Sequence, residues 1–178
     1  MTEAEFRKGM DFVQEHFMFI YPKNSSPTPA YMMDRFLEMV IKKKVDGVII
    51  DPFNQLANDW KNNGRDDHYL DVTFSLFKRF SLENNVFFHT IAHPNKMVKE
   101  KDGNYPCPSI YDLAGGSMSG NKYDNILEYH RPYYQTNPAD TRCEFRSQKI
   151  KKQMLNGIPG TATLEYNRNV GRFYDNGF

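Results

Sequence analysis

Apolar residues along this chain fall into two patterns, short continuous runs and longer stretches with an apolar position every three or four residues. The continuous runs at residues 48–50 and 86–91 are typical of strands that are buried on both faces. Helical spacing predicts helices over residues 2–16, 28–44 and 67–84. Strands that alternate with helices and are joined by right-handed crossovers form a parallel sheet covered by helices, so we expect an α/β fold.

The remainder of the chain contains shorter elements. Turn residues and alternating apolar positions predict a strand at residues 17–21, helical pieces at 109–113 and 114–122, strands at 125–130 and 142–150, and a closing hairpin of residues 161–166 and 172–174. Between the second buried strand and the helical piece at residues 109–113 lies a long polar loop at residues 97–108. Loops of this length in a compact domain are often functional.

Composition restricts the class of protein. With 178 residues, 39% of them hydrophobic and 15% aromatic, the chain is long and apolar enough to form one folded domain over residues 1–178. The formal charge of +1 gives no argument for nucleic-acid binding, although a local basic patch is compatible with it. Two cysteines without a CxxC pair argue against a disulfide scaffold or a zinc cluster. Without a bilayer-spanning apolar run or a signal-peptide core, we expect a cytoplasmic protein.

Two side chains with useful chemistry follow the two buried strands. Asp51 ends the first strand, and His93 comes shortly after the second. Carboxyl ends of parallel strands lie at one edge of a sheet, where α/β proteins bind ligands, so we expect both residues at that edge. Asp51 either contributes to a ligand or Mg²⁺ site or caps the next turn, and His93 is either a ligand-sensing or a structural histidine.

Four motifs carry a resemblance to a known family. They are DPFNQL after the first buried strand, AHPNK after the second, PSIYDLAGGS followed by NKYDNILEYHR, and QKIKKQMLNGIPG followed by LEYN. In this order, over about residues 17–174, they resemble the C-terminal half of DnaB-type replicative helicases, in particular the Twinkle and phage primase–helicase branch. The resemblance implies a RecA-like P-loop NTPase core of three layers, with a mostly parallel sheet and a C-terminal β-hairpin, incomplete at its N-terminal side.

The resemblance implies a nucleotide site for ATP and Mg²⁺ in the complete domain. Asp51 matches the Walker B aspartate, which holds Mg²⁺ through water, and His93 matches a histidine that senses the γ-phosphate. Arg131 and Tyr166 match residues that pack on the two faces of the nucleotide base. Without the resemblance, Arg131 is equally compatible with a surface arginine, and Tyr166 with a tyrosine in the core of the hairpin.

The resemblance also implies contact with single-stranded DNA. Residues 97–107 match a DNA-binding loop, in which Lys99 and Lys101 are best placed to meet phosphates, while Asn95 and Lys96 lie near its base. Flexible lysines suit contacts that do not depend on base sequence. Two acidic residues dilute the positive charge of the loop, so a solvated surface loop is the alternative.

A further segment, residues 149–160, matches the part of the family that offers cations to the ATP of a neighbouring subunit in a homohexameric ring. The family pattern there is Lys-x-Arg, whereas this chain has Lys149 and Lys151. Because lysine lacks the planar bidentate group of arginine, Arg146 is an alternative candidate for this cation. A fused or associated primase is another partner that the resemblance implies.

One motif of the family is absent from these 178 residues, the phosphate-binding sequence GxxxxGK[ST], and the glutamate expected to polarise the attacking water is missing too. We therefore expect a partial motor domain that starts after the P-loop and, alone, neither binds ATP tightly nor hydrolyses it. One alternative is a non-catalytic nucleic-acid-binding or assembly module with a degenerate nucleotide site. Another is a metal-dependent hydrolase that uses Asp51, His93 and Asp112.

Overall fold

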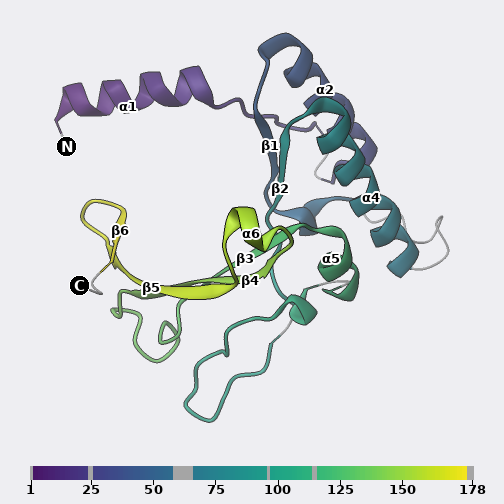
Figure 1. The fold of residues 1–178 in the computed structure, drawn as a ribbon. Coiled ribbons are helices and arrows are strands. Elements are labelled where there is room, and N and C mark those ends of the chain that lie inside the picture. The colour runs from purple at the N-terminus through teal and green to yellow at the C-terminus, as the bar shows by residue number, and fades with distance from the viewer. Residues whose placement is uncertain (1, 24–25, 58–65, 96, 114–115, 176–178) are drawn as a thin grey trace.

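The computed structural model describes residues 2–23, 26–57, 66–95, 97–113 and 116–175. Figure 1 shows the arrangement of the elements along the chain. They are α1 (Glu3–His16), α2 (Pro29–Lys43), β1 (Gly47–Ile50), η1 (Phe53–Gln55), α4 (Asp66–Asn84), β2 (Phe87–Thr90), η2 (Ile110–Asp112), α5 (Gly116–Lys122), β3 (Asn125–His130), β4 (Arg142–Ile150), α6 (Gln153–Asn156), β5 (Gly160–Asn167) and β6 (Arg172–Tyr174).

Helices α1 and α2 begin where local capping signals predict. The Thr2 hydroxyl accepts a hydrogen bond from the backbone N–H of Glu5, and the Glu5 carboxylate accepts one from the backbone N–H of Thr2, so α1 begins with a capping box. The Thr28 hydroxyl caps α2, with Pro29 at the first helical position. Helix α2 ends at Lys43, and the next residue, Lys44, has a φ of 54°, in the left-handed region that closes many helices.

Strands β1 and β2 pair in parallel, with Gly47 opposite Phe87 and Ile50 opposite Thr90. Helices α2 and α4 lie side by side next to this pair (Figure 1). The hydrophobic core lies between these elements and consists of Met32, Met33, Phe36, Val48, Ile50, Phe53, Tyr69, Leu70, Phe74, Phe77, Phe80 and Val86.

The prediction that these strands are buried on both faces is wrong. Val48 and Ile50 are buried in the core, whereas the alternate residue Ile49 is 53% exposed and Phe87 is 72% exposed. In the described part of the chain, one face of the pair packs on helices and the other has no comparable cover. A short apolar run is therefore compatible with a strand that is covered on only one side.

Strands β3, β4, β5 and β6 form a separate antiparallel sheet in that order. Their connections are too short for parallel crossovers, whereas α4 supplies the crossover between β1 and β2. The mixed α/β class and the closing hairpin of β5 and β6 are confirmed. The mostly parallel sheet is not found among the described residues, because only β1 and β2 are parallel there.

The strand predicted at residues 17–21 is also not found. These residues form no strand ladder within the described part of the chain, although Ile20 packs against the core. Helix α1, which precedes them, stands apart from the other elements (Figure 1) and has no buried residue. An apolar run becomes a strand only where a neighbouring strand can satisfy its backbone hydrogen bonds.

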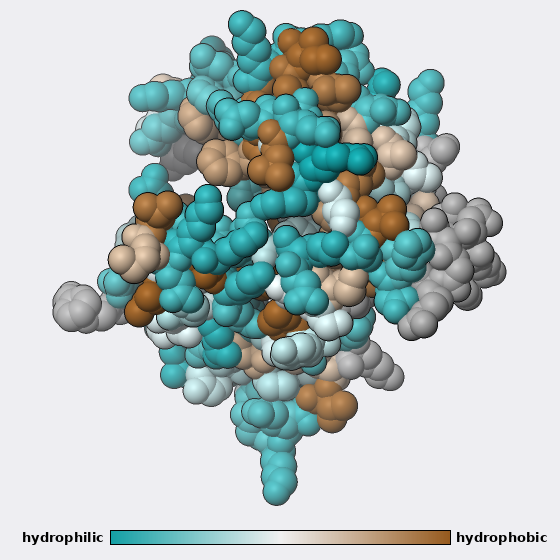
Figure 2. All heavy atoms as spheres, turned by 45° about the vertical axis from the view of Figure 1, so that its right-hand side comes forward, coloured by the Kyte–Doolittle hydropathy of each residue, from teal (hydrophilic) through white to brown (hydrophobic). Residues whose placement is uncertain are grey.

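The surface carries apolar side chains in several separate places. On the face seen in Figure 2, hydrophobic residues emerge among hydrophilic ones. None of the described helices combines the length and apolar character needed to cross a bilayer.

Candidate nucleotide and nucleic-acid site

The site begins at the carboxyl ends of the parallel pair. Asp51 follows Ile50 directly, and His93 comes three residues after β2 ends at Thr90. The pairing of the two segments continues past the strands, because the N–H of Ile91 donates to the carbonyl of Ile50 at 2.9 Å. Asp51 and His93 therefore follow neighbouring parallel strands at the same end, and both are exposed to solvent.

Asn54 joins these two tips. Its Oδ1 accepts a hydrogen bond from the backbone N–H of His93 at 2.9 Å, and its Nδ2 donates to the carbonyl oxygen of His93 at 3.4 Å. Asn54 was not among the residues predicted from the sequence. The sequence did offer one sign of it, the asparagine inside the DPFNQL motif. An amide side chain carries the same kind of donor and acceptor as a peptide group and can therefore pair with backbone.

Asp112 does not join Asp51 and His93 as a third ligand. Its carboxylate accepts hydrogen bonds from the N–H of Ser109 at 2.6 Å and from the Ser109 hydroxyl at 2.9 Å. These two bonds hold the pKa of Asp112 below its usual range. Among the described residues, no three His, Cys, Asp or Glu side chains are grouped as metal ligands. The geometry gives no support to the metal-dependent hydrolase.

The 97–108 loop extends away from both sheets (Figure 1). Lys99 and Lys101 are exposed, and Lys99 Nζ lies 5.4 Å from the ring centroid of Tyr105. The tip is anchored by Asn104, which is only 4% exposed and accepts hydrogen bonds from the N–H and hydroxyl of Thr136. The base is anchored where the N–H of Asn95 donates to the carbonyl of Asp112 at 2.6 Å. Lys96, also predicted at the base, lies outside the described residues.

The two residues predicted to pack on a nucleotide base already have aromatic neighbours. The Arg131 guanidinium lies 4.3 Å from the ring centroid of Tyr134 and donates to the carbonyl of Asp140. The Tyr166 ring centroid lies 5.0 Å from that of Phe173. Arg131 follows β3 and Tyr166 belongs to β5, so strand β4 separates them at the same end of the sheet.

The three candidate cations of β4 and its end are each engaged differently. Lys149 Nζ donates to the carbonyls of Gly120 and Tyr123, at 2.6 and 2.7 Å, where helix α5 ends. Lys151 Nζ forms an ion pair with the Asp124 carboxylate, and Arg146 with that of Glu144 at 3.3 Å. Among the three, Lys149 is therefore used to hold the chain's own backbone.

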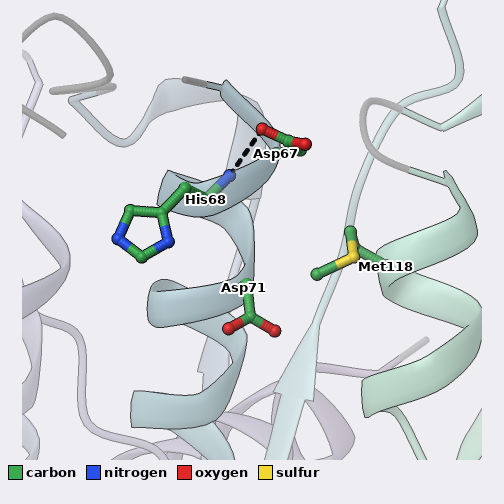
Figure 3. Close-up of a pocket in the computed structure, with 4 residues that line it drawn as sticks. All are labelled: Asp67, His68, Asp71 and Met118. Atoms are coloured by element: carbon green, nitrogen blue, oxygen red, sulfur yellow. Dashed lines mark hydrogen bonds between the residues drawn. The ribbon is translucent and has the colours of Figure 1, made fainter. Parts of the chain in front are cut away.

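A surface pocket lies between α4 and α5. It is lined by Asp67, His68, Asp71 and Met118, and the His68 ring points away from Met118 (Figure 3). The Asp71 carboxylate forms an ion pair with Lys122 at 2.6 Å. None of the residues predicted from the sequence to bind nucleotide or nucleic acid lines this pocket.

Comparison with solved structures identifies the class of fold. A DnaB-like replicative helicase, solved in work on its interactions with primase, superimposes with a TM-score of 0.71 at 18% identity, covering 97% of this chain and 42% of that one. A second solved structure, described as an ATPase domain, gives 0.70 at 17% identity, covering 98% and 61%. The chain therefore shares the fold of these two structures.

Comparison with curated protein sequences identifies a related protein. The chain is 26% identical to the chloroplastic/mitochondrial Twinkle homolog protein of Arabidopsis thaliana, over 98% of its own length. It is thus a distant homologue of Twinkle along nearly all its residues, which confirms the resemblance carried by the four motifs. It spans 24% of that relative's length. No model of a known protein family matches the chain. The relative's name places it in organelles, so the cytoplasmic location stays a prediction.

Proposed function

We propose that this chain is the C-terminal part of the ATPase motor of a replicative DNA helicase of the primase–helicase type. In this proposal, residues 1–178 form one partial RecA-like domain, which works in a homohexameric ring on single-stranded DNA, with a fused or associated primase. The observation that carries the proposal is the parallel pairing of β1 and β2, which sets Asp51 beside the segment of His93, directly ahead of the 97–108 loop.

The residues at the strand tips fit one part of an ATP–Mg²⁺ site. An exposed carboxylate such as Asp51 suits a hydrated Mg²⁺, which keeps several waters and takes few protein ligands. The His93 imidazole can donate a hydrogen bond to a phosphate oxygen. When bound, Mg²⁺ would neutralise phosphate charge, while Asp51 orients its water shell and His93 responds to the terminal phosphate.

The rest of the nucleotide site would have to come from polypeptide that carries a P-loop, either joined to this chain or separate. Phosphoryl transfer depends on positioning and charge stabilisation by such groups. We therefore expect no ATP hydrolysis by the purified chain and recovery of hydrolysis when a P-loop-bearing segment is added. Robust turnover by the chain alone that disappears in Asp51→Ala would contradict this expectation.

The DNA-binding part of the proposal is tested separately, by fluorescence anisotropy with a labelled oligo(dT). Lys99→Ala/Lys101→Ala should weaken binding and reduce the dependence of affinity on salt, by about 0.7 in log–log slope for each lost phosphate contact. Lys42→Ala/Lys43→Ala, at the end of α2, is the matched control and should leave the affinity unchanged. Equal effects of the two double variants would remove the loop from the proposal.

A second candidate function is a non-catalytic nucleic-acid-binding or assembly module with a degenerate nucleotide site. The engagement of Lys149 by the carbonyls of Gly120 and Tyr123 favours it, because a cation held this way is less available to a neighbouring subunit's ATP. Recovery of ATP hydrolysis with added P-loop polypeptide separates the two functions, since the module would not regain it.

A further inference from the structure

The pairing between the β1 and β2 segments continues for four residues past the end of β1. The N–H of Phe53 donates to the carbonyl of Ile91 at 2.7 Å, after the bond between Ile91 and Ile50. The next pair is made by a side chain, because Asn54 accepts from the N–H of His93 and donates to its carbonyl. Asn54 thus takes the place of one more peptide group in the ladder.

The short helix η1, which carries Asn54, is packed against the hydrophobic core. The preceding residue Phe53 is buried, with its ring centroid 5.3 Å from that of Phe74 and 6.3 Å from that of Phe77. The short helix η1 is therefore fixed to the core. Beyond His93, the backbone is held again where Asn95 bonds to Asp112. The segment before the 97–108 loop is thus held by Asn54 at His93 and by Asp112 at Asn95. The contact with Asn54 is the one nearer Asp51 in the chain.

We propose that Asn54 is a positioning residue, whose side-chain amide fixes the backbone of His93, and with it the start of the 97–108 loop, relative to the turn of Asp51. This inference rests on the proposed function, because it assigns Asn54 to the connection between the phosphate-facing turn and the DNA-binding loop. A displacement of the Asp51 turn is passed to His93 through two hydrogen bonds rather than through solvent. In this role Asn54 acts through the backbone of His93 and not by contact with nucleotide or DNA.

The first test is backbone amide hydrogen exchange, measured by NMR on the full chain. In Asn54→Ala, the His93 amide loses its acceptor and should exchange about fivefold faster, the factor expected for one ordinary hydrogen bond. Asn54→Asp retains an acceptor for this N–H and should retain most of the protection. Gln55→Ala, in the same turn, is the matched control and should exchange like wild type. Unchanged His93 exchange in a folded Asn54→Ala variant overturns the proposal.

The second test asks whether the position of His93 matters to the loop. Oligo(dT) affinity should fall several-fold in Asn54→Ala, less in Asn54→Asp and not in Gln55→Ala, while the unfolding midpoints stay alike. Faster His93 exchange with unchanged DNA affinity overturns the positioning role. Failure of the proposed function looks different, since the wild-type chain itself would show no salt-dependent binding, whereas the exchange result still decides whether Asn54 holds His93.

Discussion

Lys151 Nζ lies 3.0 Å from Asp124 Oδ1, and the backbone N–H of Lys151 donates to the carbonyl of the same aspartate. Lys78 from α4 pairs with the other oxygen of this carboxylate. Partial burial alone would raise the pKa of Asp124, but the hydrogen bonds from Lys78 and Lys151 outweigh it and lower the pKa. Asp124 thus ties the start of β3 to the end of β4 and to helix α4.

Two of the three candidate cations, Lys149 and Lys151, should contribute differently to the free energy of unfolding. Lys149→Met removes two charge-assisted hydrogen bonds to the carbonyls at the end of α5 and should lower the free energy of unfolding by about 1.5–3 kcal/mol. Lys151→Met breaks an exposed ion pair and should cost less than about 1 kcal/mol. Urea denaturation measures both, with the exposed Lys152→Met as control. Equal costs for the first two variants would contradict the distinction.

Gly116 should not tolerate a side chain. A Cβ there would lie 2.2 Å from the carbonyl oxygen of Ile110 and 2.6 Å from the Cα of Tyr111, and backbone atoms cannot move aside cheaply. Gly116→Ala should therefore lower the free energy of unfolding by about 2 kcal/mol or more, measured by urea denaturation. The control is Gly9→Ala in α1, where a Cβ meets nothing within 4 Å. It should raise helicity by circular dichroism, since alanine favours helices over glycine.

Cys107 should be an unreactive thiol. Partial burial, with the hydrogen bond to the Glu128 carboxylate and its negative charge, raises the pKa of Cys107 from 9.0 to about 12. At pH 8.5 iodoacetamide should label it far more slowly in the folded chain than in urea, as read by peptide mass spectrometry. Glu128→Gln should accelerate labelling. No acceleration would show that the carboxylate is not a cause of the shift.

The same shift predicts how stability depends on alkaline pH. Well below pH 9 the thiol is protonated in both the folded and the unfolded state, so its contribution to stability is fully present. As pH rises from about 9 toward 12, the unfolded thiol loses its proton while the folded one keeps it, and stability falls. Cys107→Ser should flatten this part of the curve of unfolding free energy against pH. A curve of unchanged slope would contradict the assignment to Cys107.

The stability of the tip of the 97–108 loop against local opening should depend on Asn104. Asn104→Ala leaves the N–H and hydroxyl of Thr136 without their acceptor and should lower the free energy of local opening by about 1–3 kcal/mol. Hydrogen exchange of the loop amides measures this opening. Asn137→Ala, an exposed residue of the connection that carries Thr136, is the control. Protection that is the same in both variants would show that another contact holds the tip.

The helix starts and the two strand tips could be predicted from the sequence. The capping box of Thr2 and Glu5 and the cap of Thr28 join residues three positions apart, so their geometry follows from the local chain. The order of the four motifs was enough to carry the helicase resemblance. The alternation of strands and helices was enough to predict the sheet edge that Asp51 and His93 share. The roles of these residues, and those of Arg131 and Tyr166, stay predictions.

Only the tertiary structure decided which contacts these helices and strands make. It gave residues 17–21 no strand partner among the described residues, exposed Ile49 on one face of β1, and arranged four of the strands in an antiparallel sheet. It also brought Asn54 to His93, 39 positions away, and Lys149 to Gly120, 29 positions away. Short-range capping and periodicity act between neighbours in the chain, whereas these contacts depend on how helices and strands pack, which no local pattern specifies.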